Sequence, residues 1–373
     1  MTATLTDAPA PADLRPLTTL RFLAAVWVVL FAAWPHLDAG FTPNLVAKGY
    51  LGVETFFILS GFILSHVYLE QAGGRRLNYG GFLWARVARV YPLHLATLFG
   101  VMALGLAATF AGMAIDANVL SWKSLPAQIL MVHAWGFAPE AGFNHPSWSI
   151  SAEWFAYLLF PVFAAAAWAM RRRPGAAVAA AAAFLMGLYL AFEAVAGFPL
   201  TSATFAWGAL RIVPCFALGC ALYLMHRRGA LPRPGLIAAL CGAGMIALAS
   251  INAWDGFIVP LAGGLILALA SLPNARAGWL GSKAGVYLGE ISYSVYMVCV
   301  PVKLVGMNLA ARLTGAEDKL LHPLAWLVVV ACIPLVAAGT YHLIEKPARK
   351  ALRSLADRQA IHKSATKART RLA

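Results

Sequence analysis

One apolar stretch near the start of the chain carries an arginine at one end and a histidine at the other. Arg21 lies at the beginning of the run 20–31, and His36 follows the run. In a helix the two residues would lie about 22 Å apart along the axis and about 60° apart around it. Both can therefore face one groove that crosses a membrane, which suggests chemistry carried across the bilayer. The alternative is a snorkelling arginine anchor with an interfacial histidine.

Further ionisable residues lie inside apolar segments, at two expected depths. Charges in hydrocarbon are costly, so such side chains normally face one another or a wet cavity and are functional candidates. Near the inner surface we expect Arg21, Arg86, Arg89, Glu290 and Glu345, and towards the outer surface His36, Glu54, Glu153, Glu193, Arg211 and Lys303. Glu193, Glu345 and Lys303 are near enough to helix ends for an interfacial role to be a serious alternative.

The third apolar segment begins with two arginines on one helix face. Arg86 and Arg89 are three residues apart and precede Tyr91 and Pro92. Two guanidinium groups at this spacing can grip a phosphate at the inner surface. Anchoring by cytoplasmic positive charge explains one of these arginines equally well, but explains the pair less well.

The fourth apolar segment begins with aromatic, hydroxyl and carboxylate side chains. His145 precedes Trp148, Ser149, Ser151 and Glu153. An aromatic platform beside hydroxyls and a carboxylate suits the recognition of a sugar. The alternative is an aromatic belt residue next to the N-cap of a helix.

Composition places all these residues in a membrane protein. The 373 residues are 61% hydrophobic and 12% charged, with mean hydropathy +0.72, which excludes an ordinary soluble globule. The net charge of +14 comes mainly from short loops and the tail, where it sets orientation and touches anionic lipid. We expect no nucleic-acid binding. The five cysteines lie in apolar runs without metal-ligand spacing, so we expect no disulfide and no metal site.

The apolar segments predict an all-α fold, a polytopic transmembrane bundle of about ten helices. The segments lie near 18–36, 49–70, 84–113, 148–170, 176–197, 204–225, 235–252, 255–272, 284–310 and 322–345. The piece 125–135 is too short to span and is expected to be interfacial or re-entrant.

Loop charges predict the orientation. Alternate connections hold most of the positive residues, namely Arg75, Arg76, Arg171, Arg172, Arg173, Arg227, Arg228, Arg233, Arg276 and Lys283. By the positive-inside rule these connections and both termini are cytoplasmic. We expect a polar leader at 1–16 without a cleavable signal, a membrane domain at 17–346, and a basic cytoplasmic tail at 347–373.

Six motifs occur together in a fixed order. They are residues 20–25 (LRFLAA), 49–62 (GYLGVETFFILSGF), 86–93 (RVARVYPL), 144–155 (NHPSWSISAEWF), 288–296 (LGEISYSVY) and 344–347 (IEKP). As an ordered set, covering about 15 to 350, they resemble the integral-membrane acyltransferase 3 family. Members of that family typically acylate sugars and glycans of the bacterial envelope.

The resemblance implies a multi-pass protein of the bacterial inner membrane and an acyl-CoA donor, acetyl-CoA being expected, that enters from the cytoplasm. The acceptor hydroxyl belongs to an envelope carbohydrate at the outer face. The donor residues that match are Arg21, Arg86, Arg89 and Tyr91, and the acceptor-side residues that we expect are Trp148, Ser149, Ser151, His145 and Arg211. No soluble hydrolase-like domain is expected after the tail.

The chain departs from the family pattern at the catalytic histidine. The family places a histidine eleven residues after the first-helix arginine, where this chain has Ala32. His36 lies one turn further out, displaced by about 6 Å. We predict that His36 acts as general base, with Glu54 or Glu153 orienting its imidazole.

Two alternatives remain open at this point. Either His145 or Glu153 can serve as the base, or the chain binds or transports a lipid-linked sugar without acyl transfer. Cys299, where many relatives carry a histidine before the proline, favours the second alternative. Oligomeric state is not indicated by the sequence.

Overall fold

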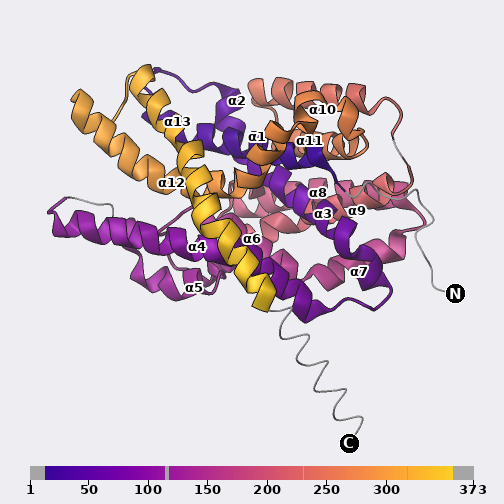
Figure 1. The fold of residues 1–373 in the computed structure, drawn as a ribbon. Coiled ribbons are helices and arrows are strands. Elements are labelled where there is room, and N and C mark those ends of the chain that lie inside the picture. Colours follow the sequence, from indigo (N-terminus) through magenta and orange to yellow (C-terminus); the bar gives the residue numbers. More distant parts are fainter. Residues whose placement is uncertain (1–12, 114–116, 230, 317, 356–373) are drawn as a thin grey trace, which may run out of the picture.

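The computed structural model describes residues 13–113, 117–229, 231–316 and 318–355, so most of the predicted leader and the end of the tail lie outside the described residues. Within these residues the chain is helical, with one isolated bridge between Leu37 and Leu321. The long helices are α1 (Arg15–Ala33), α3 (Gly52–Gly73), α4 (Tyr79–Phe110), α8 (Pro174–Ala196), α9 (Gly208–His226), α12 (Lys283–Thr314) and α13 (Pro323–Thr340) (Figure 1). The shorter helices are α2 (Asn44–Ala47), α5 (Leu125–Ile129), α6 (Ser147–Leu158), α7 (Phe160–Met170), α10 (Pro234–Ser250) and α11 (Asp255–Ala270).

By length and composition, seven helical segments of the described chain can cross a membrane. An eighth span results if α6 and α7, which meet at a bend of 59°, are one crossing, and α10 and α11 are shorter apolar helices. Pro161 lies in the first turn of α7 and cannot supply an N–H to continue α6, which explains the break. The prediction of an all-α polytopic bundle is confirmed.

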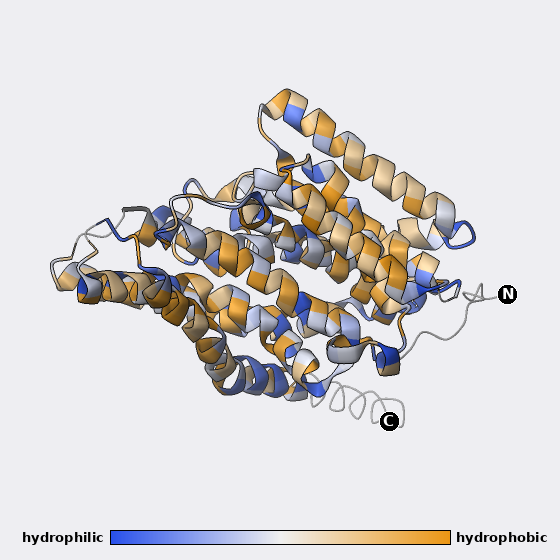
Figure 2. Ribbon diagram, turned by 90° about the horizontal axis from the view of Figure 1, so that it is seen from above, coloured by the Kyte–Doolittle hydropathy of each residue, from blue (hydrophilic) through white to orange (hydrophobic). Residues whose placement is uncertain are grey.

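Apolar residues follow most of the length of each helix, and hydrophilic residues concentrate at helix ends and connections (Figure 2). Many of the apolar side chains face outward, among them Phe110, Val195 and Leu335. Lipid tails are the solvent that accepts such a surface without cost.

Two glycines let central helices pack with their backbones in close contact. A Cβ at Gly219 of α9 would lie 2.1 Å from the Ile58 carbonyl oxygen of α3, and a Cβ at Gly289 of α12 would lie 1.9 Å from the Thr18 carbonyl oxygen of α1. Small residues at such crossings are typical of membrane helix packing. They bring α1, α3, α9 and α12 together around the ionisable residues.

A proline in α12 joins this helix to the segment before α6. Pro301 has no N–H, so the Met297 carbonyl lacks its usual helical donor. The Asn144 side-chain amide donates to that carbonyl at 2.9 Å, and the Tyr296 hydroxyl donates to the Pro146 carbonyl at 3.0 Å. The residues around His145 are therefore fixed against the middle of α12.

The last long helix does not stop at the predicted boundary of the membrane domain. The helical segment that begins at Pro323 continues to Leu355, past position 346. Near its end, the indole of Trp84 donates to the Leu352 carbonyl at 2.7 Å, which ties this extension to the start of α4.

Candidate active site

A cavity of about 310 Å³ lies where α1, α3, α4, α6 and α12 meet. Its lining residues are Arg21, Phe56, Phe57, Leu59, Ser60, Ile63, Leu64, Arg86, Arg89, Val90, Ser149, Ile150, Glu153, Tyr157, Tyr293, Tyr296 and Arg353. The cavity thus brings together the three arginines that the sequence assigned to the donor. It also contains Ser149 and Glu153, which the sequence assigned to the acceptor side.

The prediction that Glu153 lies at the outer depth is wrong, because this residue shares a cavity with Arg21, Arg86 and Arg89. The sequence suggested a straight span through 148–170, in which Glu153 lies one turn from its outer end. Instead α6 is a short helix that ends at the sharp bend before α7. Because Asn144, three residues before α6, bonds to the Met297 carbonyl in the middle of α12, α6 begins inside the bundle, and Glu153 lies beside the arginines.

Arg86 lies among aromatic rings on the wall of the cavity. Its guanidinium carbon is 5.7 Å from the ring centre of Tyr68, and 5.9 Å from those of Phe82 and Tyr157. Such contacts stabilise the cation without neutralising it. Its Nε is buried and finds no hydrogen-bond partner among the described residues. Arg86 therefore keeps hydrogen-bonding capacity and charge that a ligand can use.

Glu153 is the acidic side chain among the described lining residues. The Ser60 hydroxyl donates to its carboxylate at 2.6 Å, which fixes the carboxylate against α3. A single carboxylate cannot neutralise Arg21, Arg86 and Arg89 together. The cavity consequently carries a net positive charge.

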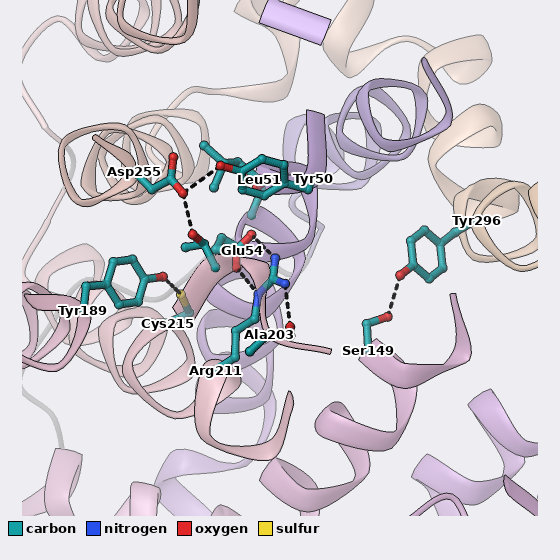
Figure 3. Close-up of polar contacts among 12 residues, drawn as sticks. Tyr50, Leu51, Glu54, Ser149, Tyr189, Ala203, Arg211, Cys215, Asp255 and Tyr296 are labelled. Carbon is teal, nitrogen blue, oxygen red and sulfur yellow. Dashed lines mark hydrogen bonds and ion pairs between the residues drawn. The ribbon is translucent and has the colours of Figure 1, made fainter. Parts of the chain in front are cut away.

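Where α6 and α12 line the cavity, the wall holds a hydroxyl pair and an aromatic pair. The Ser149 hydroxyl donates to the Tyr296 hydroxyl at 2.9 Å, as Figure 3 shows. The ring centres of Phe56 and Tyr296 are 6.1 Å apart. Ser149 therefore lines the cavity as a polar residue whose hydroxyl is bonded to α12.

Three of the predicted site residues serve the fold instead of the cavity. The Tyr91 hydroxyl donates to the Ile129 carbonyl at 2.5 Å, which ties α4 to α5. The Ser151 hydroxyl donates to the Met131 carbonyl and accepts from the Ala134 N–H, at 2.8 and 3.0 Å. Trp148 is buried beneath Arg211, with 4.7 Å between the guanidinium carbon and the ring centre.

Glu54 and Arg211 form a buried ion pair between α3 and α9 (Figure 3). The Arg211 Nε donates to one carboxylate oxygen at 2.5 Å, and one terminal nitrogen donates to the other at 3.0 Å. The second terminal nitrogen donates to the Ala203 carbonyl at 2.8 Å. Both oxygens of Glu54 are thus engaged by Arg211, so in this arrangement Glu54 positions Arg211 and not His36. Arg211 is 1% exposed and does not line the arginine cavity.

A second buried ion pair, which sequence reasoning missed, lies next to the first. Asp255 accepts from the Lys48 ammonium at 2.7 Å, from the Tyr50 hydroxyl at 2.8 Å, and from the Thr201 hydroxyl. Figure 3 shows Asp255 and Tyr50 beside the Glu54–Arg211 pair. We call Glu54, Arg211, Asp255 and Lys48 the buried network. Asp255 begins a predicted helix, but nothing in the sequence indicated that its partner lies 207 residues away.

His36 lies just after the C-terminal end of α1, in the short 3-10 turn Trp34–His36, and does not line the cavity. The end of α1 is capped by distant side chains: Lys303 donates to the Ala32 carbonyl at 3.0 Å, and Trp326 to the Ala33 carbonyl at 2.9 Å. His145 is exposed, with its ring 5.5 Å from that of Phe205. The structure therefore separates the histidine from the arginine cavity.

In the described part of the chain, no cluster of three or more His, Cys, Asp or Glu side chains could hold a metal ion.

The fold and the cavity define a polytopic membrane protein with a positively charged internal site. The comparisons with known proteins are more specific. The sequence profile of an acyltransferase domain, that of the acyltransferase 3 family, matches residues 17–343. This chain therefore belongs to the acyltransferase 3 family, and it is an acyltransferase.

Two curated relatives are similar to the chain. The acyltransferase MdmB of Streptomyces mycarofaciens is 31% identical over 381 residues, which cover 92% of this chain and 94% of the relative. A protein from Rhizobium radiobacter, named protein 2 in picA locus, is 44% identical over 69 residues, which cover 18% of this chain and 36% of that one. No solved structure matches the chain.

Proposed function

We propose that the protein transfers an acyl group from acyl-CoA, with acetyl-CoA as the expected donor, to a hydroxyl group of a carbohydrate at the outer face of the membrane. The observation that carries this proposal is the meeting of Arg21, Arg86 and Arg89 in one cavity with a single carboxylate. Such an excess of guanidinium groups suits the phosphates of CoA. Membership of the family supplies the acyl-transfer chemistry.

The donor site uses Arg21, Arg86 and Arg89 as phosphate-binding residues. Each charge-assisted hydrogen bond contributes about 1.5–3 kcal/mol. Under this proposal the protein lies in the inner membrane of a bacterium. Both of its termini are in the cytoplasm, where acyl-CoA is available.

One face of α12 connects the cavity to the outer end of α1. Tyr296 lines the cavity, and Lys303 is seven residues further along, about 10 Å on the same face. Because Lys303 donates to the Ala32 carbonyl, this face leads to the end of α1 that carries His36. The pantetheine arm of the donor would follow this face past Ser149.

His36 is the proposed general base. It takes the proton of the acceptor hydroxyl as the hydroxyl oxygen attacks the thioester carbonyl carbon. The carbon–oxygen bond forms, the carbon–sulfur bond breaks, and the leaving thiolate receives the proton to give free CoA. General base catalysis of this kind contributes about 10²–10⁴-fold. In this proposal the exposed His145 contributes to the acceptor side.

The test is release of free CoA thiol from acetyl-CoA by the purified protein when sugar acceptors are supplied. His36→Ala should abolish acceptor-dependent release, and Ala32→His in that background should restore part of it. His342→Ala is the matched control, because His342 is exposed near the other end of the bundle. Full activity of His36→Ala would show that the base lies elsewhere.

A second candidate function is binding of a lipid-linked sugar without acyl transfer. It is favoured by Ala32, whose carbonyl is occupied by Lys303 and whose methyl group offers no proton acceptor. Under this alternative the protein binds sugar ligand, while neither the wild type nor Ala32→His releases CoA thiol.

A further inference from the structure

A fourth arginine reaches the cavity from outside the segment that matches the family. The family match ends at residue 343, whereas the last helical segment continues to Leu355. Arg353, near the end of this extension, lines the cavity together with Arg21, Arg86 and Arg89. The bond from the Trp84 indole to the Leu352 carbonyl, 2.7 Å long, holds the extension against α4 next to Arg353.

Arg353 is the most exposed of the four arginines that line the cavity. Its side chain is exposed, whereas Arg21, Arg86 and Arg89 are each partly buried. Glu153, Ser149 and Tyr296 line the cavity further along α6 and α12. A ligand that enters from solvent beside the exposed Arg353 and extends towards Tyr296 would contact Arg353 first.

The surroundings of Arg353 carry an excess of like charge. Arg349, Arg86 and Arg89 all lie within electrostatic range of its guanidinium. Glu153 is the carboxylate among the described lining residues, so most of this repulsion is not relieved by the lining. An anionic ligand would relieve it, and one with several negative groups would do so best.

We propose that Arg353 binds the 3′-phosphate of the donor CoA and so makes the site selective for CoA over donors without that phosphate. This inference rests on the proposed function, which places acyl-CoA in the cavity. In CoA the 3′-phosphate is a monoester at the adenosine end, remote from the thioester. A phosphate monoester carries about −1.5 to −2 charge at neutral pH. The most highly charged single phosphate of the ligand thus meets the most exposed of the four arginines that line the cavity.

The test compares equilibrium binding of CoA and 3′-dephospho-CoA to the purified full-length protein in detergent. The wild type should bind CoA about ten-fold or more tightly than 3′-dephospho-CoA. Arg353→Gln should lose about that factor for CoA and leave 3′-dephospho-CoA binding unchanged, so that the preference disappears. Arg353→Lys should keep part of the preference, because it retains a charge without the bidentate geometry.

Lys350→Gln is the matched control, since Lys350 is an exposed cation on the same helical extension and does not line the cavity. It should retain the preference for CoA. An equal loss of both ligands in Arg353→Gln, or an unchanged preference, would overturn the assignment of Arg353 while leaving the donor site intact. Failure of the wild type to bind either nucleotide would overturn the donor proposal itself, and the role of Arg353 with it.

Discussion

The cavity and the buried network both place charged residues inside a membrane protein, but they treat charge in opposite ways. In the buried network the side chains of Glu54 and Arg211 are 0% and 2% exposed, and each charge faces an opposite charge. In the cavity, four arginines line the wall with one carboxylate, and Arg86 keeps a nitrogen without a partner among the described residues.

This difference indicates which charges are structural and which are available to a ligand. A buried pair whose polar atoms are all satisfied has no capacity left for binding, although breaking it leaves an uncompensated charge. A group of like charges beside an accessible cavity is unfavourable until an anion enters. We therefore expect substitutions in the buried network to change stability, and substitutions in the cavity to change ligand binding.

The largest effect is expected from Arg211→Met. The substitution leaves the Glu54 carboxylate buried without its partner and should destabilise the protein by about 3–5 kcal/mol. Thermal unfolding in detergent measures the loss. The double variant with Glu54→Leu and Arg211→Met should recover much of it, because an apolar pair of similar volume replaces the ion pair. A stable Arg211→Met protein with weakened CoA binding would break the comparison.

The next effect concerns donor binding. Arg86→Gln and Arg89→Gln should each weaken CoA binding about ten-fold or more, because each removes charge-assisted bonds of about 1.5–3 kcal/mol. The thermal midpoint should be nearly unchanged, since among the described residues neither arginine has a carboxylate partner that would be left unpaired. Arg76→Gln, at an exposed position in the connection before α4, is the control and should bind CoA normally. Unchanged CoA affinity in the double variant would contradict the donor site.

A smaller, pH-dependent effect is expected from His133, which lies in the connection between α5 and α6. Its ring is fully buried, is stacked 5.9 Å from that of His94, and lies 3.0 Å from the Ser147 hydroxyl. Burial, assisted by the neighbouring His94, lowers the pKa of His133 to about 3. The unfolded chain takes up a proton below about pH 6.5, but the folded protein does not until about pH 3.

Stability contributed by neutral His133 should therefore be complete above pH 6.5 and decline as the pH falls towards 3, by about 1–2 kcal/mol at pH 5. Thermal unfolding between pH 7 and pH 5 measures this slope, and His133→Gln should reduce it. If the variant and the wild type share the same slope, the buried neutral ring does not contribute to it.

The smallest effect sharpens the description of the cavity. Glu153→Gln keeps an acceptor for the Ser60 hydroxyl and removes one negative charge from the lining. CoA should bind about two- to five-fold more tightly, which corresponds to about 0.5–1 kcal/mol less repulsion. Weaker binding would show instead that the carboxylate accepts a hydrogen bond from the donor. Turnover by the same variant also distinguishes Glu153 from His36 as the base.

The sequence alone determined the class of protein and most of its helices. Uninterrupted apolar runs have few alternatives to a membrane helix, because their backbone groups must bond internally in hydrocarbon. The same reasoning placed Arg86 and Arg89 on one helix face, since the helical period fixes rotation within a single element. Both arginines do line the cavity, together with Arg21.

Tertiary structure alone decided which charges are paired and which remain available. Arg211 and Glu54 are 157 residues apart, and Ser60 and Glu153 are 93 apart, so their contacts arise only where helices cross. The start of α6 inside the bundle brought Glu153 to the arginines, and the extension of the last helix brought Arg353 to the same cavity. Helical periodicity fixes directions within one helix, whereas partners depend on the depth and crossing of several.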